Sequence, residues 1–278
     1  QMQADGRART FLKTRELLIF DETHHAGSDS SFRVLMGCPA PWRFGLSATP
    51  TGRSDRADLR TIAAIGPVIY DVPARQLVQA GVLVKPVVEF VAIDEPKLPP
   101  GTSYQDAYRQ GIVENEHRNR LAAARAHQFH DLGYTVLALV RQIDHGMALL
   151  EELRAAGVPV EFVYGGGSSA EDRRQALARL RDGRLTCLIA SEIFDEGIDV
   201  PSVDALILAG GGKSEIQVVQ RIGRGMRQGK KSPVLEVVEF ADMMDPRLAR
   251  HALERLRTYK REGIEIRYAG EQQEELTL

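Results

Sequence analysis

The chain has 278 residues, a formal net charge of −2, and 43% apolar and 27% charged residues. This composition excludes a disordered chain and is typical of a soluble globular protein that is long enough for two domains. The apolar runs fall far short of the roughly 20 residues that a membrane-spanning helix needs, and the polar first residues do not form a signal peptide. We therefore expect a cytoplasmic protein without a membrane partner.

Cysteine usage and charge exclude further classes of protein. Cys38 and Cys187 are the two cysteines and neither lies in a C-x-x-C pair, which excludes a disulfide framework and a cysteine-based metal site. Cys187 stands in an apolar run, so we expect it in a core. The small negative net charge excludes a surface that is basic throughout, so any nucleic-acid binding must use a local stripe of basic residues.

The first third of the chain contains short apolar runs that end in polar residues. Residues 17–20 and 44–47 predict buried parallel strands. Residues 82–93 are rich in valine but are interrupted by Pro86. Residues 94–101 are rich in proline and acidic side chains and cannot continue a strand or a helix, so they predict a linker.

After this linker, strands alternate with helices. We expect strands at 136–140, 160–164, 185–190 and 205–209, and helices at 116–132, 145–156, 170–181 and 246–262. Ser169 and Asp172 are placed as in a capping box for the third of these helices. The alternation predicts an α/β fold with a parallel sheet covered on both faces and ligands outside the carboxyl ends of the strands.

The same pattern predicts the domain organisation. Residues 1–92 are expected to form the C-terminal part of a first α/β domain, 93–102 a linker, 103–240 a complete second domain, and 241–278 a C-terminal helix and tail.

An acidic pair, Asp21 and Glu22, closes the apolar run 17–20. One carboxylate of such a pair can hold the magnesium ion that bridges nucleotide phosphates, and the next can accept a proton from an attacking water. Ser47 and Thr49 follow the run at 44–47, and their short hydroxyl side chains can change hydrogen-bond partners when a neighbouring domain moves. Alone, each motif is more typical of an ordinary solvated strand end than of a catalytic site.

Two basic side chains and an amide recur at helical spacing in the second domain. Gln220, Arg224 and Arg227 share one face of a helix, and guanidinium groups suit the charge that spreads over a transferring phosphoryl group. The alternative is a basic helix exposed to nucleic acid or to solvent.

The run at 185–190 is followed by residues suited to nucleotide and phosphate contacts. Gly197 permits close backbone approach, Asp199 can accept a hydrogen bond from a ribose hydroxyl, and Ser191 can donate to a phosphate. A plain polar loop and a simple strand cap are the alternatives.

A phosphate-binding loop of the form G-x-x-x-x-G-K-[ST] does not occur within the 278 residues. Residues 210–214 contain Gly-Lys-Ser, but the first glycine of the motif would have to stand at Ile207. We interpret this segment as a glycine-rich turn between a strand and a helix.

In this order, the motifs resemble those of the DExH-type helicases and translocases of superfamily 2, especially the XPB-like, phage-helicase and restriction-translocase branch. Residues 21–24 resemble motif II, 46–50 motif III, 138–141 motif IV, 189–201 motif V and 220–227 motif VI. The resemblance covers nearly the whole chain but lacks motif I. It implies two RecA-like parallel-sheet domains, the first incomplete at its N-terminus, with ATP in the cleft between them.

The resemblance also implies roles for individual residues. Asp21 would be the Mg2+ partner and Glu22 the catalytic base, while Arg224 and Arg227 would sense the γ-phosphate. His24, Ser47, Thr49 and Gln220 would couple the domains, Gly197 and Asp199 would touch the nucleotide, and Arg141 and Ser191 would contact the nucleic-acid backbone.

The function implied by the resemblance is that of an ATP-dependent DNA helicase or translocase using ATP and Mg2+. DNA is favoured over RNA, without sequence specificity, and a nuclease or another repair or restriction protein is a candidate partner. Because motif I is absent, this chain alone is expected to bind ATP poorly. The alternative is an ATPase-deficient nucleic-acid or protein-binding module that retains the helicase fold. A phosphate loop encoded upstream of Gln1 would favour the first interpretation, and a start codon near Gln1 the second.

Overall fold

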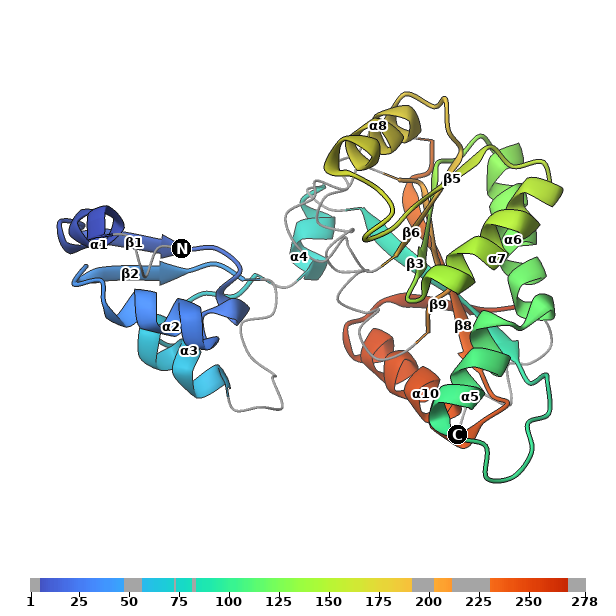
Figure 1. Cartoon of the computed structure of the whole chain (residues 1–278), viewed down its shortest axis with the longest axis horizontal. Helices are drawn as coiled ribbons and strands as arrows, with labels where there is room; N and C mark the ends of the chain where they lie inside the picture. Colours follow the sequence, from blue (N-terminus) through green and yellow to red (C-terminus); the bar gives the residue numbers. More distant parts are fainter. Residues whose placement is uncertain are drawn as a thin grey trace. The chain divides into compact units, whose positions relative to one another are not determined.

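The chain folds as two units, Gln1–Val72 and Pro73–Leu278 (Figure 1). The computed structural model describes residues 6–47, 57–72, 74–81, 84–191, 203–211 and 231–269. None of the helices formed by these residues is long and apolar enough to span a membrane.

The first unit contains a two-stranded parallel sheet. Its strands are β1 (Leu17–Phe20) and β2 (Trp42–Gly45), and Leu17 lies opposite Trp42. Its helices are α1 (Gly6–Lys13), the 3-10 turn η1 (Thr23–His25), α2 (Asp29–Met36) and α3 (Ala57–Ile65). The two expected parallel strands are thus confirmed, the second beginning two residues earlier than the run at 44–47.

One face of this small sheet is buried and the other is not. Leu18 and Phe20 pack against the cluster that contains Leu35 of α2 and Ala64 of α3. Leu17 and Ile19 point the other way and are 52% and 60% exposed. Trp42 and Phe44 of β2 are also exposed, at 66% and 42%. The expectation that 17–20 and 44–47 are buried strands is therefore wrong within the described residues, although parallel strands are normally covered on both faces.

The second unit is built on a seven-stranded parallel sheet with the order β5-β6-β4-β7-β8-β3-β9. The strands are β3 (Lys85–Ile93), β4 (Val136–Val140), β5 (Val160–Val163), β6 (Cys187–Ser191), β7 (Ala205–Leu208), β8 (Val234–Asp242) and β9 (Glu265–Tyr268). This arrangement confirms the predicted α/β fold with a parallel sheet.

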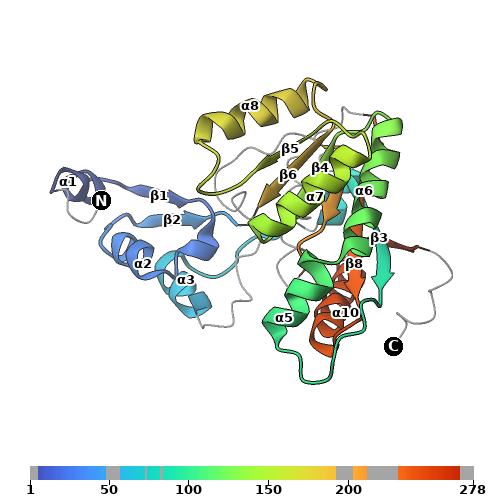
Figure 2. The same ribbon diagram turned by 45° about the vertical axis from the view of Figure 1, so that its right-hand side comes forward.

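Helices cover both faces of the sheet (Figure 2). The described helices of the second unit are α4 (Ala74–Gln79), α5 (Tyr104–Tyr108), the π-helical turn η2 (Arg109–Val113), α6 (Glu116–Asp131), α7 (Ile143–Ala155), α8 (Ala170–Arg181) and α10 (Pro246–Arg261). Helices α6 and α7 pack on one face, and α8 and α10 on the other. Side chains alternate along each strand, so Val136, Ala138 and Val140 of β4 face α6 and α7 while Leu137 faces α8 and α10.

The helices expected from the sequence are confirmed to within two residues at their ends. The capping box at the start of α8 is also present: Ser169 Oγ accepts from the Asp172 N–H at 3.1 Å, and Asp172 Oδ2 accepts from the Ser169 N–H at 2.8 Å.

The expected domain boundary at residue 92 is wrong. Strand β3 pairs with β8 along its whole length and with β9 from Val87 to Phe90, so residues 85–93 belong to the second unit. The boundary lies between Val72 and Pro73. Pro86 is tolerated because β9 begins its pairing only at Val87, and Pro86 therefore has a strand partner on one side alone.

The separate tail expected at 241–278 is also wrong for its described part. Strand β8 runs to Asp242, α10 packs on the sheet, and β9 extends it. Pairing between segments so distant in sequence leaves no local signal from which the boundary could be predicted.

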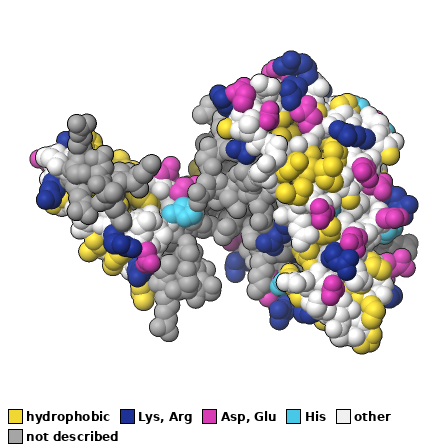
Figure 3. Space-filling model, viewed as in Figure 1, with side chains coloured by type: hydrophobic (Ala, Val, Ile, Leu, Met, Phe, Trp, Pro, Cys, Tyr) yellow, Lys and Arg dark blue, Asp and Glu magenta, His cyan; other side chains and the backbone are white. Residues whose placement is uncertain are grey.

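Basic and acidic side chains are interspersed over the visible face of the second unit (Figure 3). No extended area of one sign dominates the described surface in this view, which agrees with the net charge of −2.

Candidate functional site

The acidic pair lies at the carboxyl end of β1 with an unusual backbone. Asp21 and Glu22 are both exposed, and Asp21 Oδ1 accepts from the Glu22 N–H at 2.8 Å. Glu22 has φ 51° and ψ 54°, and among the described residues it is the one non-glycine with a positive φ. A non-glycine residue occupies this region only where its surroundings impose it, and such residues cluster at functional sites.

Thr23 fastens this turn to the end of β2. Its N–H donates to the Leu46 carbonyl and the Leu46 N–H donates to the Phe20 carbonyl, both at 2.9 Å. The Thr23 hydroxyl lies 3.0 Å from each of these two carbonyl oxygens. A Cβ at Gly45 would lie 2.4 Å from Thr23 Oγ1, so only glycine permits this approach. The carboxyl ends of the two strands are thereby locked together beneath Glu22.

Ser47 follows Leu46 at this same edge, so the structure brings it to the strand end next to that of the acidic pair. His24 lies in η1, but its side chain and the whole of Thr49 lie outside what the structure describes. Domain coupling by His24, Ser47 and Thr49 stays a prediction.

The Asp21 carboxylate fits a magnesium ion. It is exposed at the strand end, and carboxylate oxygen is the ligand that Mg2+ prefers. Mg2+ commonly takes one or two carboxylates together with phosphate oxygens and waters, so a larger protein cage is not required. Among the described residues, no three His, Cys, Asp or Glu side chains gather as a metal site.

Two further candidates meet at the carboxyl edge of the second unit's sheet. Arg141 directly follows β4, and Ser191 is the last residue of β6 and pairs with Val140. The two candidates therefore stand at neighbouring strand ends, as predicted for ligand contacts. Ser191 is only 7% exposed, whereas Arg141 is exposed.

The remaining candidates lie outside the described residues. They are Gly197, Asp199, Gln220, Arg224 and Arg227.

A cavity of about 600 Å³ lies beside Arg141. It is lined by Tyr104, Gln105, Asp106, Tyr108, Arg109, Arg141 and Gln142. The Tyr108 hydroxyl donates to the carbonyl of Gly210, two residues beyond β7, at 2.5 Å. The cavity therefore adjoins the ends of both β4 and β7, and no sequence motif had indicated it.

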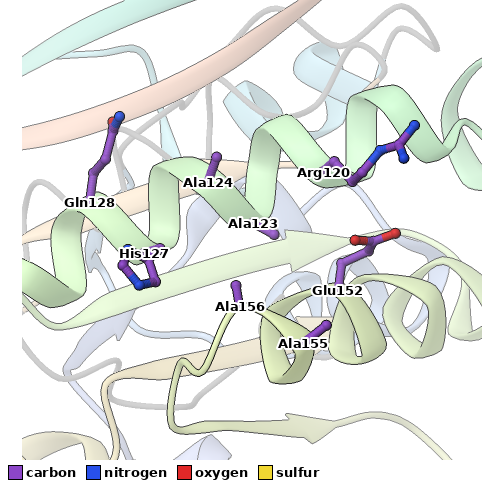
Figure 4. A pocket seen from close by; sticks show the side chains of 8 residues that line it. All are labelled: Arg120, Ala123, Ala124, His127, Gln128, Glu152, Ala155 and Ala156. Atoms are coloured by element: carbon purple, nitrogen blue, oxygen red, sulfur yellow. The ribbon is translucent and has the colours of Figure 1, made fainter.

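A second pocket, of about 490 Å³, lies between α6 and α7 (Figure 4). Its lining includes four alanines, Ala123, Ala124, Ala155 and Ala156. These residues lie in the C-terminal halves of helices that flank β4, toward the amino edge of the sheet. The pocket is thus at the edge where ligands of parallel sheets do not usually bind.

Arg118 of α6 fixes the ends of two strands from within the protein. Its Nε donates to Asp242 Oδ1 at 2.8 Å, and its Nη1 donates to the Ala209 carbonyl at 2.6 Å. The guanidinium carbon lies 4.4 Å from the centre of the Phe240 ring. Both charged side chains are almost completely buried, and such a pair is tolerated only with hydrogen bonds of this quality. One side chain thus holds the ends of β7 and β8 at the edge that carries Arg141.

Asn115 anchors the same helix to the chain before it. Its Oδ1 accepts from the Arg118 N–H at 3.1 Å, and its Nδ2 donates to the carbonyls of Glu95 and Gly111 at 2.6 and 3.0 Å. The sequence did contain a signal for this network. Polar residues stand at 115, 118 and 119, which is helical spacing, and Ala122 on the same helix face is buried.

His145 completes the buried network as a neutral base. Its Nε2 lies 3.0 Å from Asn119 Oδ1, and the Asn119 Nδ2 donates to the Val113 carbonyl, so Nε2 carries the proton. Burial, with the charge of Arg118 adding to it, lowers the pKa of His145 to about 3. The imidazole is therefore uncharged near neutral pH and is no proton donor to a ligand.

Cys187 is confirmed as a core residue. It is completely buried in β6, and burial raises the pKa of its thiol to about 12. Both properties disfavour the thiolate, which is the reactive form of cysteine, and fit a packing role.

The sequence of this chain matches a known helicase domain. The family profile of the helicase conserved C-terminal domain matches residues 122–229. Putative helicase 22 of Sulfolobus islandicus filamentous virus is 26% identical over 256 residues, which are 85% of this chain and 45% of that protein. The putative DNA 3'-5' helicase Rad25 of Halobacterium salinarum is 28% identical over 261 residues, 90% of this chain and 40% of that protein.

The chain belongs to superfamily 2 of the helicases. Helicases of RNA are also among its relatives. The crystal structure of UvsW of phage T4 has the same fold, with a TM-score of 0.54, 20% identity, and coverage of 94% of this chain and 55% of that one. The chain spans less than half the length of the two helicase relatives described above. The matched domain lies within the second unit and includes Arg141 and Ser191, whereas the acidic pair lies in the first.

Proposed function

We propose that the chain supplies the hydrolytic edge and the nucleic-acid-binding domain of an ATP-dependent DNA helicase or translocase. The observation that carries this proposal is the left-handed backbone of Glu22, next to Asp21 and fastened through Thr23 to the end of β2. The constraint fixes the direction in which the Glu22 side chain leaves the backbone at the carboxyl edge of a parallel sheet. This edge is where open α/β sheets bind nucleotides.

Within this proposal, the acidic side chains act on the phosphates and on water. Asp21 holds Mg2+, which would neutralise charge on the nucleotide phosphates. Glu22 orients the attacking water and accepts its proton. Arg224 and Arg227 stabilise the charge on the transferring phosphoryl group, a role that their helical spacing and the family resemblance support.

We propose further that the second unit contacts the nucleic-acid backbone through Arg141 and Ser191. DNA is proposed because relatives of the chain are named as DNA helicases. Contacts to phosphates carry no sequence information, so affinity for DNA is expected to fall with salt and to depend little on base sequence.

The experiment compares Glu22→Gln with Glu16→Gln in the protein encoded by the complete reading frame. Glu16 is an exposed glutamate of the same unit, one residue before β1, and makes a matched control. We expect Glu22→Gln to lower DNA-stimulated ATP hydrolysis by about 100- to 10,000-fold, the usual worth of a general base, while ATP binding is retained. Glu16→Gln should hydrolyse ATP as the wild type does. Undiminished hydrolysis in Glu22→Gln would remove this residue from the mechanism.

A second candidate is an ATPase-deficient module that binds nucleic acid or protein and keeps the helicase fold. The 278 residues contain no G-x-x-x-x-G-K-[ST] motif, so the motif that separates the two candidates has to be sought in the reading frame. The reading frame decides between the two: a phosphate loop encoded upstream together with DNA-stimulated hydrolysis supports the motor. A frame without that loop, whose product hydrolyses no ATP, supports the module.

A further inference from the structure

The cavity beside Tyr104 lies where the connections of the sheet diverge. From β4 the chain passes to β5 on one side, whereas from β7 it passes to β8 on the other, and β4 and β7 are neighbours. In open α/β sheets, ligands bind outside the carboxyl ends of the strands at such a switch point. The position of the cavity in the topology therefore indicates a ligand site within the second unit.

Helix α5 is held at this switch point by direct contacts. The Tyr108 hydroxyl donates to the Gly210 carbonyl, and a Cβ at Gly210 would lie 2.7 Å from Arg141 Cγ. The loops after β4 and β7 and the C-terminal end of α5 therefore form one packed unit around the cavity.

The ring of Tyr104 is fixed in position but open to solvent on part of its surface. It lies 6.4 Å from the Tyr108 ring and meets the His251 ring edge-on at 5.9 Å. The Arg247 guanidinium lies 5.9 Å from its centroid. The side chain is 37% exposed and lines the cavity. A ring held by these contacts can stack on a base while losing little side-chain conformational entropy on binding.

The charges around the cavity are largely compensated. Arg109 pairs with Glu114 at 2.9 Å, and Arg247 pairs with Asp245 at 2.8 Å. The hydrogen bonds that Arg109 donates to Glu114 raise the pKa of Arg109, and those that Arg247 donates to Asp245 lower the pKa of Asp245. Arg141 stands at the strand end itself. The site thus combines a partly exposed aromatic ring, Tyr104, with amide groups and a guanidinium at a strand end, which suits a nucleotide with one phosphate better than a strongly anionic ligand.

We propose that this cavity binds one nucleotide of single-stranded DNA, with the base stacked on Tyr104 and a backbone phosphate held by Arg141. The proposal rests on the proposed nucleic-acid binding and adds a base-contacting residue that the motifs did not contain. Because stacking tolerates every base, the site contributes affinity without sequence preference.

The test measures binding of a short fluorescein-labelled oligothymidylate to the chain by fluorescence anisotropy. We expect Tyr104→Ala to weaken binding about 5- to 150-fold, the worth of one stacked base, while Tyr104→Phe stays within about twofold. Tyr70→Ala is the matched control, since Tyr70 is 81% exposed and lies in the other unit. With an oligonucleotide whose sugars lack bases, Tyr104→Ala should bind as the wild type does.

A cross-linking experiment gives a second readout that does not depend on a variant. Oligonucleotides carrying 5-iodouracil attach to nearby aromatic side chains on irradiation. Trypsin releases both cavity tyrosines in one peptide, residues 98–109. We expect this peptide to carry the cross-link, and the cross-link to be lost in Tyr104→Ala.

The outcomes separate the two proposals. A wild-type chain that does not bind the oligonucleotide overturns both the nucleic-acid function and the stacking site. A wild-type chain that binds while Tyr104→Ala binds equally well, or loses equal affinity for the base-free strand, overturns the stacking site alone. Cross-links confined to other peptides have the same consequence.

Discussion

His145 is expected to make the stability of the second unit fall as the pH is lowered from 8 to 5. Its pKa is lowered to about 3 in the folded protein by burial and by the charge of Arg118, against 6.5 for an ordinary histidine. Below pH 6.5 the unfolded chain takes up a proton that the folded chain refuses. The contribution of His145 to stability is therefore complete above pH 6.5 and is lost progressively between pH 6.5 and about 3.

The magnitude follows from the two pKa values. Each pH unit inside the window costs about 1.4 kcal/mol, so the loss between pH 8 and pH 5 is about 2 kcal/mol. The carboxyl groups whose pKa values are lowered, such as Asp94, Asp106 and Asp172, titrate at more acidic pH and contribute little in this range.

Urea unfolding can assign this loss to one unit. Trp42 is the single tryptophan of the chain and lies in the first unit, so its fluorescence reports that unit alone. Far-UV circular dichroism reports the helices of both units, so a dichroism transition that Trp42 fluorescence does not follow belongs to the second unit. The variant His145→Gln can still donate to Asn119 but does not titrate, and it should lack the pH dependence of the wild type in the dichroism transition.

Two results would refute this reasoning. One is a wild-type stability of the second unit that is flat from pH 8 to pH 5. The other is an equal pH dependence in His145→Gln, which would place the titrating group elsewhere.

Two further substitutions test the packing at the sheet edge. Arg118→Met leaves the Asp242 carboxylate buried without its cation and should lower the free energy of unfolding in urea by about 3–5 kcal/mol. The double variant with Asp242→Leu should restore most of this loss. A single variant whose stability lies within about 1 kcal/mol of the wild type would contradict the pairing. Gly146→Ala in α7 would gain up to about 1 kcal/mol from helix propensity alone, yet its Cβ would lie 2.1 Å from Phe162 Cζ, so we expect a loss of about 1–3 kcal/mol in thermal unfolding. A more stable Gly146→Ala would show that the ring moves aside freely.

The elements from residue 116 to 209 could be predicted because their signals are local. The alanine-rich face of α6 and the capping box at Ser169 are visible within a few residues of sequence. The sheet membership of β3 and β9 could not be predicted in this way, since it is decided by pairing with β8. Strand β8 itself was missed because it contains Glu239, a fully buried acid that is paired with Arg255 of α10.

For the candidate site, too, the features with a local sequence signal could be predicted and those that depend on distant contacts could not. The sequence placed Asp21 and Glu22 at a strand end, and the structure confirms that position. The left-handed backbone of Glu22 could not be predicted, because the turn that contains it is fastened through Thr23 to Leu46, which follows another strand far along the sequence. Tyr104 was missed because it lies on a short helix before α6 that carries no recognisable motif. Only the fold brings it close to the ends of β4 and β7, where it lines the cavity.

The position of β3 in the sheet also affects the order in which the strands of the second unit can pair during synthesis. This strand is translated before every other strand of its sheet, yet it lies between β8 and β9, the last two strands to be made. While the ribosome works through the residues between them, β3 has no neighbour of its own sheet to pair with. A valine-rich segment with open backbone groups is then exposed to aggregation or to capture by chaperones. Completion of the second unit is therefore expected to follow the release of its C-terminal strand, and the distant pairings make this step slow compared with formation of the local helices.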